Sequence, residues 1–273
     1  MSTHGEQDYV LGTHDDEIRR LGVQHRVWRP RVIDAWRRAG FRSGQMLLDV
    51  GCGPGYATLD LAEIVAPGGR VIAVDRSRRF LDALESERAR RGLENVTVAE
   101  CDLDLAGLPA TGADGAWCRW VLAFVRRPHD LVRRIHDALK PGGTLVAHEY
   151  FDYSTWRLAP RCEEFEEFVR LVMKSWRSSG GEPDIALDLP GWLESLGFRI
   201  RELRPIIDVI GPADPAWAWP REFFEVGLPR LVDLGELSEA RAAEIRAAFA
   251  AREAQPGTLM VTPGVLEVIA ERK

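Results

Sequence analysis

Short apolar runs alternate with helix-length segments through the first half of the chain. The runs are MLLDV, RVIAVD, NVTVAECD, GAWCRWVL and GTLVAHEY. Between them, apolar residues recur at helical spacing near residues 55–66, 77–92 and 128–139. Parallel neighbours in a sheet need a crossover connection, and helices of this length supply it. The alternation therefore predicts a doubly wound α/β domain, whose mostly parallel sheet is covered by helices on both faces.

The flanking segments are expected to add helices to this core. Residues 1–44 are predicted to form an N-terminal helical cap of two short helices, which break near Pro30 and end at Gly40. Residues 45–273 are expected to form the main domain. Within it, the aromatic-rich segments 150–180 and 210–256 are predicted to make a helical lid, inserted before the last strand.

The second half of the chain predicts three further helices and two further strands. Apolar residues over 165–176 have the spacing of an amphipathic helix. A short helix is expected behind Asp188 as its N-cap, and a third helix from Ser238. Strands near 198–209 and 264–272 complete a sheet of seven strands.

Composition limits the partners and the compartment. The chain has 273 residues and a formal net charge of -6, which disfavours nucleic-acid binding because phosphate backbones are held mainly by clustered cations. The start MSTHGEQDYV has no apolar signal region, and no run approaches the roughly 18 apolar residues of a membrane span. We therefore expect a cytoplasmic protein that does not bind membranes. Its cysteines are too far apart for a paired metal site and are expected to be reduced, mostly buried thiols: Cys52, Cys101, Cys118 and Cys162.

A glycine-rich turn follows the first predicted strand, in LLDVGCGPGYATLDLA. Gly51, Gly53 and Gly55 permit the positive φ values of a tight turn and let a ligand approach the backbone without interference from a Cβ. The next residues begin a helix, whose first N–H groups have no partner within it. Three alternating glycines exceed what a plain strand-to-helix turn needs, so we interpret this segment as a cofactor loop.

The spacing of the loop does not match the dinucleotide pattern. That pattern, GxGxxG, needs its third glycine where Tyr56 stands, whereas the sequence here is GxGxG. Asp75 lies 20 residues after Gly55, at the end of the second strand, where an acidic residue binds ribose hydroxyls. Asp75 alone is compatible with a nicotinamide dinucleotide or with another adenosine-containing cofactor.

Four motifs in order give the chain a family resemblance. LLDVGCGPG, VIAVDRS, AECDL and LKPGGTLVAHEY resemble the motifs of class I S-adenosylmethionine-dependent methyltransferases, over nearly the whole chain from Tyr9. The arrangement of the segments around these motifs resembles that of the small-molecule branch near the ubiquinone and menaquinone biosynthesis methyltransferases. These segments are YVLG, RLGVQH, CRWVL and HEYFD. The resemblance implies a Rossmann-like methyltransferase fold and S-adenosylmethionine as the cofactor.

The resemblance also implies which residues hold the cofactor. The three loop glycines would line its methionine and ribose part, with Asp49 fixing the loop from beneath. Asp75, followed by Arg76, would take the ribose hydroxyls, because a carboxylate can accept two hydroxyl hydrogen bonds. Asp102 would take the adenine amino group beside Leu103, with a turn cap as the alternative.

Two further groups of cofactor residues are expected. Arg119, at the end of the fourth strand, either meets the methionine carboxylate or orients its loop. Tyr9, Arg20 and Gln24 resemble residues that close over the cofactor, and an exposed amphipathic helix is the alternative.

Methyl transfer is an in-line displacement that requires neither a metal nor a covalent residue. A base is useful when the acceptor must lose a proton, and the candidates are His148, Glu149 and His25. Successive strand residues face opposite ways, so His148 and Glu149 are not both expected in one crevice. A packing role is the alternative for each histidine.

The substrate is expected between the sheet edge and the lid. The aromatic residues expected there would make the acceptor apolar or aromatic, unless they only join the lid to the core: Tyr150, Phe151, Trp156, Trp176, Trp219 and Phe223.

The sequence therefore predicts an enzyme that transfers a methyl group from S-adenosylmethionine to O, N or C of a small organic acceptor. The alternatives are a protein of the same fold that binds S-adenosylmethionine without methyl transfer, and an NAD-dependent oxidoreductase. The acceptor is left open, as is the choice between a monomer and a homodimer.

Overall fold

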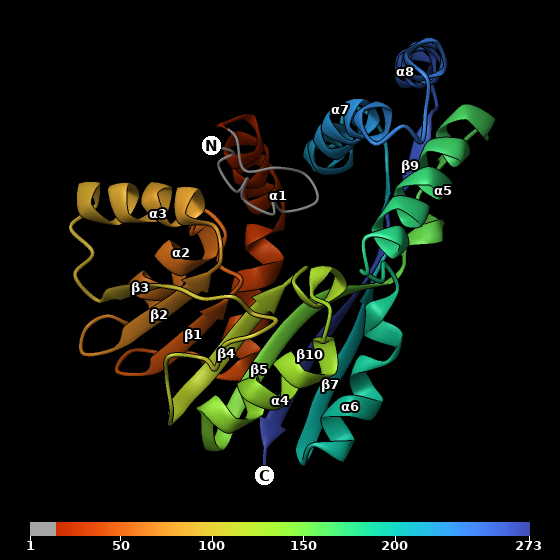
Figure 1. The fold of residues 1–273 in the computed structure, drawn as a ribbon. Helices are drawn as coiled ribbons and strands as arrows, with labels where there is room; N and C mark the ends of the chain where they lie inside the picture. The colour runs from red at the N-terminus through yellow and green to blue at the C-terminus, as the bar shows by residue number, and fades with distance from the viewer. Residues whose placement is uncertain (1–14) are drawn as a thin grey trace, which may run out of the picture.

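A sheet of seven strands forms the centre of the computed structural model, which describes residues 15–273 (Figure 1). In spatial order the strands are β3 (Val96–Glu100), β2 (Arg70–Asp75), β1 (Met46–Val50), β4 (Ala113–Arg119), β5 (Leu139–Asp152), β10 (Gly264–Arg272) and β7 (Phe198–Ile206). Each pair from β3 to β5 is parallel, whereas β10 runs antiparallel to both of its neighbours. The predicted mostly parallel, seven-stranded sheet is confirmed.

Helices pack on both faces of this sheet. Leu47 of β1 shares a core with Trp28 and Trp36, whereas the next residue, Leu48, shares a core with Leu131 and Leu193. The first core belongs to α1 (Asp15–Ala39) and α2 (Tyr56–Val65), and the second to α4 (Pro128–Ala138) and α6 (Leu189–Ser195). The helix α3 (Arg78–Arg90) packs beside β2 and β3.

The segments predicted as a lid lie together beyond the carboxyl end of β5 (Figure 1). They contain α5 (Glu163–Ser178), α7 (Ala218–Asp233) and α8 (Glu239–Ala254). A small sheet of β6 (Arg157–Ala159), β9 (Leu259–Val261) and β8 (Val209–Ile210) accompanies them, and its central strand β9 lies beyond the predicted segments. Phe224 joins the three helices, since its ring lies 4.9 Å from that of Phe168 and 4.3 Å from that of Phe249. A lid function for these helices stays a prediction.

Short 3-10 turns connect several of these elements: η1 (Leu122–Phe124), η2 (Tyr153–Thr155), η3 (Ile185–Leu187) and η4 (Pro215–Trp217).

Three local predictions differ from the structure. The expected break at Pro30 is wrong, because α1 continues through it as one helix. Pro30 lies on the exposed side, while the buried stripe of α1 continues on the other side and holds the helix on the sheet. The strand expected over 198–209 ends at Ile206, and Val209 begins β8 of the small sheet. Asp188 is the N-cap of α6 by position, but its side chain makes no capping hydrogen bond.

Two other predictions, on the helix from Ser238 and on the cysteines, are confirmed. Ser238 is the N-cap of α8 and accepts a hydrogen bond from the Arg241 amide. All four cysteines are buried and unpaired. Among the described helices, none combines the length and apolar character needed to cross a membrane.

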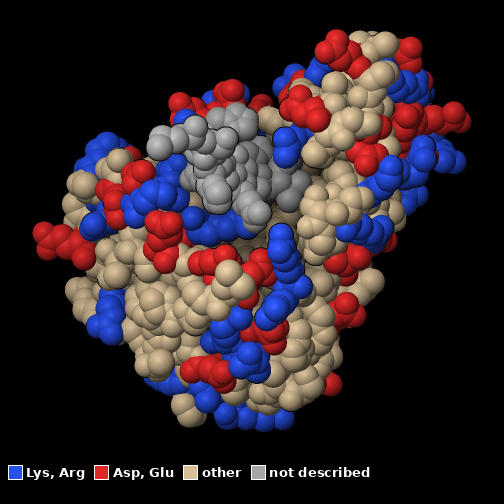
Figure 2. All heavy atoms as spheres, viewed as in Figure 1, with Lys and Arg blue, Asp and Glu red and all other residues tan. Residues whose placement is uncertain are grey.

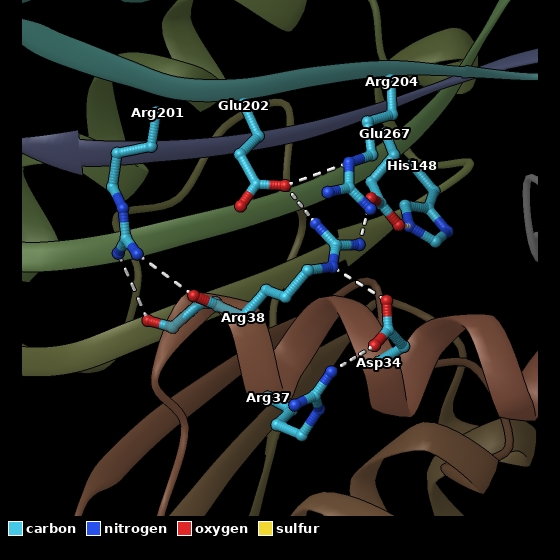
Figure 3. A network of polar contacts seen from close by, with 9 residues as sticks. Asp34, Arg37, Arg38, His148, Arg201, Glu202, Arg204 and Glu267 are labelled. Atoms are coloured by element: carbon cyan, nitrogen blue, oxygen red, sulfur yellow. Dashed lines mark hydrogen bonds and ion pairs between the residues drawn. The ribbon is translucent and has the colours of Figure 1, made fainter.

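A buried charge network fixes the second half of α1 to the sheet (Figure 3). Arg38 lies near the end of α1, and its guanidinium contacts Asp34 at 2.8 Å, Glu202 of β7 and Glu267 of β10. Glu267 is 3% exposed and also accepts a hydrogen bond from His148 of β5, at 3.0 Å. One arginine therefore neutralises a buried carboxylate and ties a helix to two strands.

We expect Arg38→Ala to destabilise the protein by about 3 kcal/mol, because it leaves Glu267 buried without its cation. The neighbouring Arg37, whose side chain is 77% exposed, pairs with Asp34 alone, and Arg37→Ala should cost no more than about 0.5 kcal/mol. Urea unfolding of the two variants measures the difference. Equal stabilities would show that the network does not anchor α1.

Candidate active site

A pocket lies at the carboxyl ends of β1, β2 and β4, between α1 and the lid helices. Its walls come from α1, the glycine loop, the ends of β2 and β4, the segment after β3, and the residues Tyr150, Trp176 and Phe223. The sheet order places β4 beside β1 on the side opposite β2, so the crevice lies where the direction of strand addition reverses. Open α/β sheets bind their ligands at such a point.

The structure favours glycine at the three loop positions for different physical reasons. All have positive φ, at 68°, 54° and 83° for Gly51, Gly53 and Gly55. A Cβ on Gly51 would lie 2.3 Å from Val121, and one on Gly55 would lie 2.3 Å from Leu84. A Cβ on Gly53 would meet no atom within 4 Å. Gly51 and Gly53 line the pocket, whereas Gly55 does not and instead allows α3 to pack closely.

The backbone amides of this loop are already used. Gly51 and Cys52 both donate to the Val74 carbonyl, at 2.8 and 2.9 Å, and Gly55 donates to the Cys52 carbonyl at 3.0 Å. Gly53 donates to the Asp75 carboxylate at 2.8 Å. The loop thus offers space to a ligand, and these four amides are not available to a pyrophosphate.

Two predicted acidic residues lie at the rim of the pocket. Asp75 accepts the amide of Gly53 on one oxygen and that of Ser77, at 2.9 Å, on the other. Asp102 accepts the Asp104 amide at 2.8 Å and so caps a turn, as the alternative reading expected. Both aspartates nevertheless line the pocket, together with Arg76 and Leu103.

A buried acid and a partly buried cation line the pocket and interact electrostatically. Asp49 accepts a hydrogen bond from the Thr58 hydroxyl at 2.6 Å, and burial raises the pKa of Asp49 to about 7. Burial lowers the pKa of Arg119 to about 10, so this side chain remains a cation at neutral pH. Its Nη2 lies 3.3 Å from His25 Nδ1, while its Nη1 is buried and has no hydrogen-bond partner. Arg119 thus keeps one unused donor beside the pocket.

The three candidate bases do not line the pocket. His25 lies 3.1 Å from Asp60 through Nε2, and burial lowers the pKa of its imidazole. Because a carboxylate can only accept, the neutral ring donates Nε2–H to Asp60, and Nδ1 accepts from Arg119. In this geometry His25 positions Arg119, and its role as a base stays a prediction.

His148 and Glu149 point to opposite faces of β5, as the alternation of strand residues predicts. His148 contacts Trp28 and Trp117 and bonds Glu267, so burial and packing account for it. Glu149 lies beneath the loop that follows β4 and accepts the amides of Val121 and Leu122 at 2.8 and 2.9 Å. Both have buried structural partners in this geometry, and a catalytic role for either stays a prediction.

The six predicted substrate residues divide into two groups. Tyr150, Trp176 and Phe223 line the pocket. The other three do not: Trp156 packs on Phe165 and Phe168, Phe151 lies beside Gly264, and Trp219 stacks on Trp120.

The predicted closing residues of α1 also divide. Arg20 and Gln24 line the pocket, where Arg20 contacts Glu17 through two 2.7 Å hydrogen bonds and Gln24 at 3.0 Å. Tyr9 lies outside the described residues.

Several pocket residues were not predicted. The largest are Phe80, Trp117, Trp120 and Phe124, and Tyr56 follows the glycine loop directly. Trp120 could have been found, because it comes immediately after Arg119 at the end of the fourth strand. Phe80 belongs to a helix whose apolar stripe gives no sign of which member faces a ligand.

Comparison with known proteins agrees with this arrangement. Residues 48–147 match the family model of a methyltransferase domain. A demethylmenaquinone methyltransferase from Geobacillus stearothermophilus is 32% identical over 193 residues, covering 67% of this chain and 81% of that protein. The ubiquinone/menaquinone biosynthesis C-methyltransferase UbiE from Pseudomonas paraeruginosa is 28% identical over 130 residues, or 47% of this chain and 50% of that protein. For several curated relatives, the chain spans half of their length or less.

Solved structures share the fold at low identity. The [4+2]-cyclase SpnF superposes with a TM-score of 0.57 at 20% identity, covering 89% of this chain and 80% of that chain. At this identity the likeness shows a shared fold and nothing more. The protein that shares the fold is described as a cyclase.

The buried Glu149 gives the protein a specific pH dependence. Burial raises the pKa of Glu149 from its ordinary value to about 7, although the backbone amides that it accepts oppose this. Between about pH 4.5 and pH 7 the folded protein therefore holds a proton that the unfolded chain releases, so this group's contribution to stability falls as the pH rises. Glu149→Gln should reduce the loss of unfolding free energy between about pH 5 and pH 8 by roughly 2 kcal/mol.

Urea unfolding at the two pH values measures this change, with Glu194→Gln on the exposed side of α6 as the control. The control should keep the wild-type pH dependence. If Glu149→Gln also keeps it, Glu149 does not take up a proton on folding.

Proposed function

The chain belongs to the class I S-adenosylmethionine-dependent methyltransferases, and we propose that it methylates a small acceptor with an apolar or aromatic body. The observation that carries this proposal is that the pocket lining contains two kinds of residue. The polar half of the lining consists of Asp49, Asp75, Asp102 and Arg119. The aromatic half consists of Tyr150, Trp176, Phe223, Phe124 and Trp120, and Arg119 touches it at Trp120.

The polar half fits the cofactor. Each Asp75 oxygen accepts one amide and keeps a lone pair for a ribose hydroxyl. The buried, unpaired Nη1 of Arg119 suits a carboxylate, and the open space beside Gly53 admits a ligand against the backbone. We assign the methionine part to Asp49, Gly51, Gly53 and Arg119, the ribose to Asp75 and Arg76, and the adenine to Asp102 and Leu103. Arg20 and Gln24 would close the site from α1.

S-adenosylmethionine supplies a methyl group that its sulfonium already activates. The protein's part is then to align the acceptor and to exclude water. Among residues 15–273, no histidine lines the pocket, so alignment rather than a histidine base is the proposed contribution. The aromatic walls and the buried α1 face supply the water exclusion.

The names of two relatives support the acceptor class, since they are described as acting on demethylmenaquinone and in quinone biosynthesis. An aromatic acceptor also suits the rings of Tyr150, Trp176 and Phe223. The chain spans only half of the second relative, so the acceptor itself is our proposal.

Charge supports a small-molecule partner. Acidic and basic side chains are interspersed on the face seen in Figure 2, and no single-sign field extends across that face. The exclusion of nucleic acid, the cytoplasmic location and the homodimer stay predictions.

The proposed function is tested by thermal shift with S-adenosylmethionine, S-adenosylhomocysteine and NAD(H), followed by an acceptor screen that detects S-adenosylhomocysteine release. We expect stabilisation by the two adenosyl ligands and turnover with an aromatic acceptor, because a ligand that binds only the folded state raises its stability. Binding without release by any acceptor would favour a non-methylating member of the fold. Stabilisation by NAD(H) alone would reject the proposal.

The ribose assignment predicts that Asp75→Ala weakens S-adenosylhomocysteine binding at least tenfold, about 1.4 kcal/mol. Calorimetric titration measures the affinity. Asp82→Ala on the exposed face of α3 is the control and should bind as the wild type does, because Asp82 pairs with Arg78 outside the pocket. Unchanged binding by Asp75→Ala would remove Asp75 from the site.

A further inference from the structure

Trp120 has an unusual backbone for a bulky residue. Among residues 15–273 it is the only residue other than glycine with a positive φ, at 52°. The left-handed region costs a residue with a Cβ roughly 1–2 kcal/mol. Such a conformation persists only where the surrounding structure determines it, and it is frequent at functional sites.

The left-handed turn changes where the ring lies. On β4, Trp117 faces α1, Cys118 faces Glu149 on the other side, and Arg119 faces His25 of α1 again. Regular alternation would turn Trp120 to the Glu149 side. Instead its ring packs against Trp28 of α1, with the ring centroids 5.1 Å apart. Two consecutive side chains, Arg119 and Trp120, thus lie on the pocket side of the sheet.

Aromatic rings and a cation surround the Trp120 ring. Tyr150 stacks on the ring at 5.3 Å with an interplanar angle of 14°, and Trp219 of α7 stacks at 5.7 Å with an angle of 12°. The Arg119 guanidinium lies over the same ring, 5.1 Å from its centroid. Trp120 also lines the pocket. The indole edge carries the only hydrogen-bond donor of the side chain, Nε1–H.

That donor has no partner. Among the described residues that line the pocket, two have a buried side-chain donor without a hydrogen bond: Arg119, through Nη1, and Trp120, through Nε1. An unsatisfied buried donor costs roughly 1–3 kcal/mol, so the strained residue is also an unsatisfied one. The two donors come from adjacent residues whose side chains touch, since the Arg119 guanidinium lies 5.1 Å from the centroid of the Trp120 ring.

The other neighbours of the two side chains differ. Arg119 lies beside His25 and interacts electrostatically with Asp49. Trp120 stacks on Tyr150 and on Trp219 of α7.

We propose that Trp120 Nε1 donates a hydrogen bond to an oxygen of the acceptor and that this bond selects aromatic acceptors carrying such an oxygen. The assignment rests on the proposed function. A site with a buried donor discriminates strongly against an analogue that lacks the matching acceptor atom, because the donor is then left unpaired. The backbone strain at Trp120 is the cost of presenting this edge to the substrate.

The test compares isosteric ligands that differ in one oxygen. The probes are acetophenone against α-methylstyrene, and 2-acetylnaphthalene against 2-isopropenylnaphthalene, titrated in the presence of saturating S-adenosylhomocysteine. For the wild type we expect the better-fitting ketone to bind at least tenfold tighter than its alkene, about 1.4 kcal/mol. Trp120→Phe keeps a stacked ring but removes the donor, and should reduce this ratio to about threefold or less.

The control is Trp192→Phe, which changes a half-buried tryptophan of α6 outside the pocket and should keep the wild-type ratio. Melting temperatures of both variants check folding. An unchanged ratio in Trp120→Phe overturns the proposal, as does equal binding of ketone and alkene by the wild type. A loss of S-adenosylhomocysteine affinity in Trp120→Phe with the ratio retained would assign the donor to the cofactor and also overturn it.

Two results separate this inference from the function on which it rests. If neither pair binds while S-adenosylhomocysteine does, the aromatic ketone class is rejected and the methyltransferase assignment stands. If S-adenosylhomocysteine does not bind the wild type, the proposed function fails. The ketone-to-alkene ratio measured without it then still decides whether Trp120 donates.

Discussion

The site depends on one buried carboxylate beneath the loop that follows β4. Glu149 accepts the amides of Val121 and Leu122 and so fixes the loop against the sheet. Val121 in turn occupies the place where a Cβ of residue 51 would lie, which forces glycine at the start of the cofactor loop. Arg119 and Trp120 lead into the same loop, so their orientation follows from the same anchor. A side chain outside the pocket thus shapes both halves of it.

The helix α1 supplies the other wall, and tertiary contacts rather than local propensity determine its shape. Pro30 favours a break, but the buried stripe that includes Trp28 and Trp36 and the ion pairs of Arg38 hold one continuous helix on the sheet. These contacts join residues more than 150 positions apart. No local pattern contains them, which explains why the sheet was predictable from the sequence and the path of α1 was not.

The same reasoning separates the site residues that were predictable from those that were not. Asp75 and Arg119 end their strands and Asp49 is the last residue but one of β1, and a parallel sheet necessarily gathers strand ends at one edge. The alternation of β5 correctly opposed His148 and Glu149, but it could not show that each had a buried partner of its own. Sequence could not show that four predicted residues lie outside the pocket, because their places depend on how α3 and the lid pack, and packing depends on side-chain shape. These residues are Gly55, Phe151, Trp156 and Trp219. The positive φ of Trp120 has no sequence signature, because tryptophan is among the residues least suited to it.

The stack of Tyr150, Trp120 and Trp219 joins three elements that are distant in sequence: the ends of β5 and β4, and α7. Any movement that withdraws α7 from the sheet must therefore uncover a face of Trp120. The ring would then lose one of its two stacked neighbours. The position of α7 and the position of the Trp120 ring are therefore coupled through the contact with Trp219.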